Sequence, residues 1–157
     1  MNIRALPVLI AVLALPLGGC AVSIGDSGDV VRVPASAASS LTVRLQGIET
    51  PKGQIMLAMF DSAAAHDRGG EPVRAAAVPV TGASAVTTFE GLAPGDYAIK
   101  LFHDLDGDNQ MDTNPFGMPI EPFAFSNDAK AEGGPAMWEA TRFPVAAGAN
   151  TITISIK

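Results

Sequence analysis

A hydrophobic period of two constrains the fold of this chain more than any other feature. Between residues 41 and 157 the clearest alternation of apolar with polar positions has its apolar members at Leu41, Val43, Leu45, Ile152, Ile154 and Ile156. This pattern is typical of a β-strand with one buried face and one solvated face. Five further strands are predicted at residues 54–60, 73–80, 85–89, 97–103 and 138–145, because Gly, Pro, Asn and Asp separate these segments.

Seven short strands joined by turns predict an all-β fold, a seven-stranded antiparallel β-sandwich. A parallel sheet would need crossover helices, and the sequence offers little helix beyond one turn at residues 62–67. The segment Leu92-Ala93-Pro94-Gly95-Asp96-Tyr97 supports this choice. It is similar to the turn before the tyrosine corner of Ig-like and transthyretin-like sandwiches, in which the tyrosine hydroxyl bonds to upstream backbone.

The N-terminus has the three-part layout of a secretory signal. Arg4 precedes the apolar run of residues 5–17, and small residues follow it. A helix that crosses a bilayer needs about 20 apolar residues, so this run is too short for an uncleaved anchor. We expect residues 1–19 to be a signal peptide.

The signal ends in Leu17-Gly18-Gly19-Cys20, which resembles the lipobox of bacterial lipoproteins. The resemblance implies that Cys20 is lipidated and becomes the first mature residue, which would anchor the domain to a membrane. The residue after Cys20 is Ala21 and not Asp, which favours sorting of the lipoprotein to the outer membrane. The domain would then face the periplasm or the cell surface. The alternative is ordinary cleavage nearby, with Cys20 incidental.

Composition divides the rest of the chain into a tether and one domain. Residues 20–40 are rich in Ser, Ala, Gly and Asp and are expected to form the lipidated N-terminus and a flexible tether, although Val30, Val31 and Val33 could pair as an edge strand. Residues 41–157 are expected to form a single β-sandwich domain. With its one cysteine in the lipobox, the domain must fold without a disulfide. The net charge of −6 argues against nucleic acid as a partner.

An acidic loop follows the strand at residues 97–103. The spacing of its carboxylates, at Asp104, Asp106, Asp108 and Asp112, is similar to that of a calcium-binding loop. Gln110 would add its backbone carbonyl as a ligand. Pro115 stands where such a loop has its bidentate Glu, so we expect Glu121 to supply that carboxylate. Binding would be weak, at a Kd of about 10⁻⁴ to 10⁻³ M. The alternative is a solvated acidic turn without a metal.

The connection from residue 103 to residue 137 is too long for an ordinary turn and too apolar for a disordered linker. We expect it to be an ordered loop that folds over one end of the sandwich. The aromatic residues Phe116, Phe123, Phe125 and Trp138 are expected to form its own small core. The alternative is an exposed platform for a protein or glycan ligand.

Several motifs together resemble a bacterial family of secreted proteins, domain of unknown function 2141. They are the turn before Tyr97, the His103-Asp104 pair, Asp112-Thr113-Asn114, and the run from Gly117 to Asn127 that contains Phe123 and Phe125. The resemblance covers residues 41–157 and implies a β-sandwich and export. It implies no catalytic residue. Asn114, Phe123, Phe125 and Asn127 are expected to organise the long loop.

Two functions remain open from the sequence. The first is a non-catalytic binding or structural module of the cell envelope, stabilised by Ca²⁺. The second is a metal-assisted hydrolase centred on His103 and the acidic loop. Neighbours on a strand point to opposite faces, so His103 and Asp104 would not act together. For His103 we therefore expect a structural hydrogen bond that ties the long loop to its strand.

Overall fold

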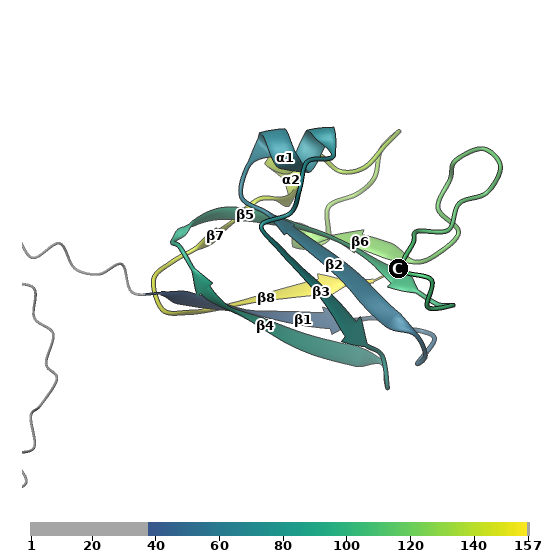
Figure 1. The fold of residues 1–157 in the computed structure, drawn as a ribbon, viewed down its shortest axis with the longest axis horizontal. Coiled ribbons are helices and arrows are strands. Elements are labelled where there is room, and N and C mark those ends of the chain that lie inside the picture. Colours follow the sequence, from purple (N-terminus) through teal and green to yellow (C-terminus); the bar gives the residue numbers. More distant parts are fainter. Residues whose placement is uncertain (1–37, 157) are drawn as a thin grey trace, which may run out of the picture. The chain divides into compact units, whose positions relative to one another are not determined.

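The computed structural model describes residues 38–156, which form two β-sheets packed face to face (Figure 1). In chain order the elements are β1 (Ser39–Gln46), β2 (Gln54–Phe60), α1 (Ala63–Arg68), β3 (Arg74–Pro79), β4 (Ser84–Leu92), β5 (Gly95–Asp104), β6 (Phe123–Phe125), the short 3-10 helix η1 (Ser126–Asp128), α2 (Trp138–Thr141), β7 (Phe143–Val145) and β8 (Ala149–Ser155). The expected signal peptide, the Cys20 lipidation site and the tether as far as residue 37 lie outside the described residues. Within the described range, no helix is long and apolar enough to cross a membrane.

The smaller sheet has the strand order β4-β1-β8, and the larger sheet has the order β3-β2-β5-β6 with β7 also paired to β5. Pairing in the larger sheet is antiparallel throughout. In the smaller sheet β1 is antiparallel to β4 but parallel to β8, so the first and last strands of the domain run side by side in the same direction. The prediction of an all-β sandwich is confirmed.

Two details of the strand prediction need correction. The count of seven is one short, because the long connection contributes the short strand β6 to the edge of the larger sheet. Residues 138–145 are not one strand: the first four form α2, and only Phe143–Val145 is a strand. The aromatic ring of Trp138 explains this difference, since the helical turn packs it against Phe60 and Ala98 in a second apolar cluster.

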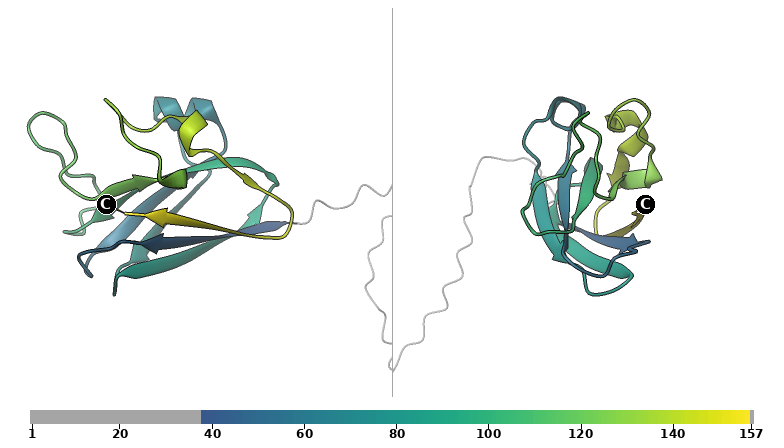
Figure 2. Two further views of the ribbon diagram at one scale, coloured as in Figure 1. Left: turned by 180° about the vertical axis from the view of Figure 1, so that it is seen from behind. Right: turned by 90° about the vertical axis from the view of Figure 1, so that its right-hand side faces the viewer.

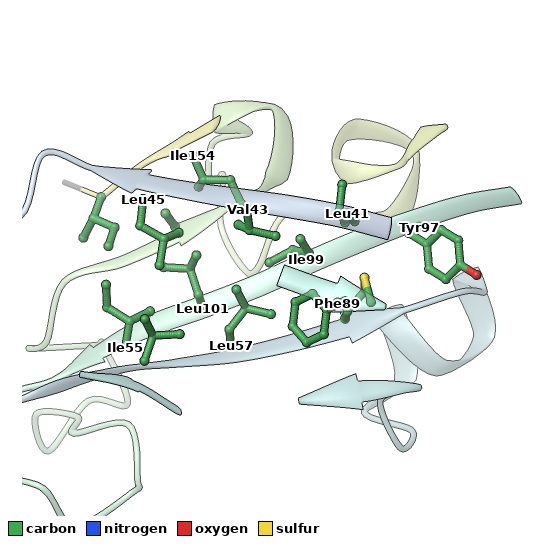
Figure 3. Packing of buried hydrophobic residues seen from close by; sticks show 14 of the residues in the cluster. Leu41, Val43, Leu45, Ile55, Leu57, Phe89, Tyr97, Ile99, Leu101 and Ile154 are labelled. Carbon is green, nitrogen blue, oxygen red and sulfur yellow. The ribbon is translucent and has the colours of Figure 1, made fainter. Parts of the chain in front are cut away.

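The core lies between the sheets and consists of one face of each strand (Figure 3). Fully buried side chains come from both sheets and include Leu41, Val43, Leu45, Ile55, Met59, Ile99 and Ile154. The alternation that predicted the strands also defines this face, because every second residue of β1 points into the core. Burial of a Leu or Ile side chain contributes about 1.5–3 kcal/mol, so this core supplies the main stabilisation of the domain.

Two local features besides the strand pattern also match the sequence. The hydroxyl of Tyr97 donates to the carbonyl of Ala93 at 2.8 Å, so the predicted tyrosine corner is confirmed. The single predicted helical turn is α1, which Ser62 caps through its side chain and Gly69 ends in a left-handed conformation. Figure 2 shows the two short helices on one side of the sandwich, with the long loop extending from one end of the sheets.

Candidate functional site

The acidic loop begins at Asp104, the last residue of β5. Its carboxylate is fully buried and accepts three hydrogen bonds, from Gln54 Nε2 at 2.9 Å, from the Gly107 N–H at 2.7 Å and from the Asn109 N–H at 3.0 Å. Gln54 reaches it because the two residues are directly opposite in the β2–β5 pair. Asn109 takes the left-handed conformation that the tight loop requires, with φ 65°. Asp104 therefore organises the loop.

The carboxylates of Asp106 and Asp108 lie beside that of Asp104. One oxygen from each of the three residues lies within 4.8 Å of the other two. Asp106 Oδ1 accepts from the Asp108 N–H at 3.2 Å, and Asp108 Oδ1 accepts from the Gln110 N–H at 2.7 Å, so two successive Asx-type turns shape the loop. Both aspartates are exposed.

Asp112 and Glu121, which were expected to be metal ligands, lie outside the carboxylate cluster of Asp104, Asp106 and Asp108. Glu121 is buried, and its two oxygens accept from the Leu105 N–H at 2.7 Å and from the Asp112 N–H at 3.2 Å. Within residues 38–156, the group of carboxylates close enough to share an ion contains neither Asp112 nor Glu121. Glu121 instead holds the two ends of the loop together.

The surroundings of Asp104 and Asp112 shift the pKa values of these two carboxyl groups in opposite directions. The Gln54 amide and the backbone N–H groups of Gly107 and Asn109 hold the pKa of Asp104 below its usual range, against the effect of burial. Loss of hydration, followed by repulsion from neighbouring carboxylates, raises the pKa of Asp112. The protein's own donors already hold the loop at Asp104, while the other carboxylates repel one another.

His103 is buried on the opposite face of β5 from Asp104. Its Nε2 lies 2.7 Å from the carbonyl oxygen of Lys52, and its backbone N–H donates to the Pro122 carbonyl at 2.8 Å. The side chain therefore fixes the loop between β1 and β2 and not, as was expected, the long loop, whereas the main chain of His103 holds the long loop at Pro122. The recess beside it, which Glu49 helps to line, has a volume of about 60 Å³. Ligand pockets usually enclose about 300–1,000 Å³.

The tip of the long loop is a small hairpin with exposed apolar side chains. Asn114 organises it, because its Oδ1 accepts from the N–H groups of Phe116 and Met118 at 2.9 and 3.0 Å. Phe116 is 91% exposed, and Met118 and Ile120 are more than half exposed. The expectation that Phe116 packs into a core of the loop is wrong. Trp138 lies in the separate cluster with Phe60.

The outer face of the larger sheet is an apolar groove of about 1020 Å³. Strand register places its floor in two rows across four strands. The first row is Ala77, Met56, Phe102 and Phe123, and the second is Ala75, Ala58, Lys100 and Phe125. Phe123 and Phe125 touch edge to face, with their ring centroids 5.8 Å apart. Most floor residues are only partly buried, so the groove opens to solvent.

Small residues in the floor and loops at the border produce this hollow. The short side chains of Ala58, Ala75 and Ala77 leave space above β2 and β3. Strands usually carry larger, β-branched or aromatic side chains at such positions. The border comes from the loop around Met118 and from residues 131–135. Among the described residues that line the groove, Lys100 alone carries a charge.

A buried polar network joins α1 to α2 next to Lys100. His66 is fully buried, with Nδ1 2.7 Å from Asp67 Oδ1 and Nε2 3.3 Å from Thr141 Oγ1. Asp67 also accepts from the Trp138 N–H at 2.9 Å. Burial lowers the pKa of His66, although the hydrogen bond that its ring donates to Asp67 opposes this effect. The network fixes the helix pair.

Asn127 lies in η1 with a left-handed backbone, φ 61°. Its side-chain amide donates to the carbonyls of Ala140 and Arg142, at 3.2 and 2.9 Å. The neighbouring Ser126 is fully buried and accepts from the Ile99 N–H at 2.9 Å. These contacts attach the end of the long connection to α2 and to the centre of β5.

The groove was not predicted from the sequence, although β2 contains a signal for it. Its sequence QIMLAMF is apolar on both faces, unlike the alternating strands β1 and β8. A strand that is apolar on both faces must be covered on both sides or present an apolar surface. Here Met56 and Ala58 form that second face.

Fold and surface together define an all-β sandwich with a long ordered loop and an open apolar groove on its larger sheet. A family model described as an uncharacterized protein conserved in bacteria, DUF2141, matches residues 43–153. The chain therefore belongs to this family, and the predicted resemblance is confirmed. Searches of curated proteins and of solved structures gave no match.

Proposed function

We propose that this protein is an exported, lipid-anchored binding module of the cell envelope, and that its binding site is the apolar groove on the larger sheet. The groove is the observation that carries the proposal. Its volume of about 1020 Å³ is at the upper end of the 300–1,000 Å³ typical of ligand pockets. An apolar surface of this kind on a folded domain usually marks a place of interaction.

The lining favours an apolar ligand over a glycan. A sugar needs side chains that exchange hydrogen bonds with its hydroxyl groups, besides an aromatic platform. The floor supplies Ala, Met and Phe side chains, and Lys100 is the single cation in it. Met56, Met111 and Met118 are well suited to such a surface, because unbranched thioether side chains adapt to ligands of different shape.

The position of His103 weighs against the hydrolase alternative. A general base must come within hydrogen-bond distance of its substrate. His103 is 1% exposed, its Nε2 is engaged with the Lys52 carbonyl, and the adjoining recess holds about 60 Å³. The acidic loop lies on the other side of the sheet from this ring. These contacts support a structural role for His103.

Export and anchoring enter the proposal from residues 1–20 of the sequence. The apolar run at residues 5–17 and the lipobox-like Leu17-Gly18-Gly19-Cys20 support them. Labelling of cells with radioactive palmitate compares the wild type with Cys20→Ala. The proposal expects label in the wild type alone, and equal labelling of both would refute the lipid anchor.

Binding of N-phenyl-1-naphthylamine, a neutral apolar fluorophore, tests the groove. Ala77→Phe places a ring over the floor at a strand position that tolerates Phe, and it should weaken binding about tenfold or more. Val86→Phe is the matched control, because Val86 is exposed on the smaller sheet. Equal affinity in both variants, or no binding to the wild type, would contradict a ligand site in the groove.

A further inference from the structure

Lys100 occupies an unusual position in the groove. It lies in the second row of the floor, between Ala58 and Phe125, and it is the one charged lining residue in the described part of the chain. Its Nζ donates to the carbonyl of His66 and lies 5.4 Å from the centroid of the Phe60 ring. Within residues 38–156 it forms no ion pair.

The ammonium group of Lys100 has N–H donors that its contacts in the protein leave unused. It carries three N–H donors, and the hydrogen bond to His66 uses one of them. Partial burial removes hydration and lowers the pKa of Lys100, although the nearby charge of Asp67 opposes this effect. An anionic group in the groove would supply both a charge partner and hydrogen-bond acceptors.

The rest of the floor extends away from this cation as apolar surface. The row containing Met56 and Phe102 lies next along the strands toward the acidic loop, with Met118 at the border. Four strands at a spacing of about 4.8 Å make the floor about 14 Å wide. The groove thus combines one positive charge at the end near the helix pair with an apolar surface that continues to the long loop.

From this arrangement we infer that the ligand of the groove is an amphiphile with a single acyl chain and an anionic head group, whose head pairs with Lys100 and whose chain lies over Met56 and Phe102. The inference rests on the proposed function and specifies its ligand class. Charge complementarity is the argument for this occupant. A neutral apolar molecule would remove water from the Lys100 ammonium without supplying a charge partner, and a cationic amphiphile would add repulsion.

Displacement of N-phenyl-1-naphthylamine by three ten-carbon amphiphiles tests the inference. The full chain with Cys20→Ala, which cannot be acylated at that position, is titrated with decanoate, decanol and decyltrimethylammonium below their micelle concentrations. We expect decanoate to compete at least about tenfold better than decanol, and the cation to compete worst. Lengthening the carboxylate should improve competition by up to about fourfold per methylene group.

Variants of Lys100 test whether its ammonium group causes the preference for decanoate over decanol. Lys100→Gln should abolish the preference for decanoate over decanol, Lys100→Arg should keep it, and Lys52→Gln, which removes an exposed lysine outside the groove lining, should leave it unchanged. The charge-conserving arginine variant shows whether a loss reflects charge or misfolding. Equal competition by decanoate and decanol in the wild type, a preference that survives in Lys100→Gln, or no displacement by any of the three would overturn the inference.

These outcomes separate the inference from the proposed function. If the fluorophore binds the wild type and Ala77→Phe weakens its binding, the groove is a ligand site whatever the head-group preference. If head groups then make no difference, the anionic amphiphile is wrong and the apolar site stands. If the fluorophore binds Ala77→Phe and the wild type equally, both are wrong.

Discussion

Glu121 Oε1 accepts a hydrogen bond from the backbone N–H of Leu105 at 2.7 Å, across the base of the acidic loop. The second carboxylate oxygen accepts from the Asp112 N–H, so one buried side chain joins the first and the last part of the loop. Met118, which borders the groove, lies in the chain between Asp112 and Glu121. Glu121 therefore links the acidic loop to the proposed binding surface.

Replacement of this carboxylate should loosen the loop. Glu121→Gln turns one acceptor into an amide that faces a backbone donor, and leaving such a buried group unsatisfied costs about 1–3 kcal/mol. We expect a lower free energy of unfolding in urea and faster amide hydrogen exchange at Leu105 and Asp112. Glu132→Gln changes an exposed glutamate and serves as control. Unchanged protection of both amides would show that Glu121 does not hold the loop.

Calcium binding by the acidic loop stays a prediction from the sequence, which thermal melting can test. With a Kd of about 1 mM, 10 mM Ca²⁺ would stabilise the fold by about 1.4 kcal/mol, a rise of a few degrees in Tm. Asp106→Asn combined with Asp108→Asn should abolish this rise, since both carboxylates belong to the cluster within 4.8 Å.

The matched control for this melt is Asp61→Asn combined with Glu132→Gln, which removes the same charge from exposed sites elsewhere. It should keep the response to Ca²⁺. If the wild type has the same Tm with Ca²⁺ and with chelator, the loop is a solvated acidic turn that binds no Ca²⁺. An equal rise in all variants would place the ion elsewhere.

Stability should fall in mild acid because of His66. Burial lowers its pKa in the folded state below the value of 6.5 that it has when unfolded, so the unfolded chain binds more protons as the pH falls through this range. The contribution of neutral His66 is present above pH 6.5 and is lost below it. Of the charged groups that shift this pKa, Lys100 lowers it and Asp67 raises it.

Urea unfolding between pH 8 and pH 5 measures this effect. The free energy of unfolding of the wild type should decrease over the acid half of that range, and the profile of His66→Gln should be flatter. The glutamine variant stays neutral at every pH while it keeps polar contacts toward Thr141. Parallel profiles for the two proteins would assign the acid sensitivity to other groups.

The sequence predicted the core better than the surface. Alternation in β1 and β8 identified the buried residues directly, because burial in the core is a local consequence of strand periodicity. It did not reveal that β1 and β8 pair in parallel, since pairing partners depend on the path of the whole chain. Trp138 was assigned to a strand because its helical turn is too short to show a period of 3.6.

The acidic loop was located from sequence, but the roles of its residues were only partly foreseen. Asp104, Asp106 and Asp108 come together as spacing suggested, because alternating residues converge when a loop curls. Glu121 instead binds backbone, a contact that depends on how the long loop returns. The groove needs residues from four strands, and no single segment of the sequence contains that information.

Methyl NMR of the methionines gives the most direct test of a ligand site in the groove. Met56, Met111 and Met118 line the groove, Met59 is fully buried in the core, and Met137 is exposed outside the groove lining. In protein labelled with ¹³C at the methionine methyl groups, titration with decanoate should shift the signals of Met56, Met111 and Met118 and leave those of Met59 and Met137 in place. Shifts confined to Met137, or no shift at Met56, would contradict the account.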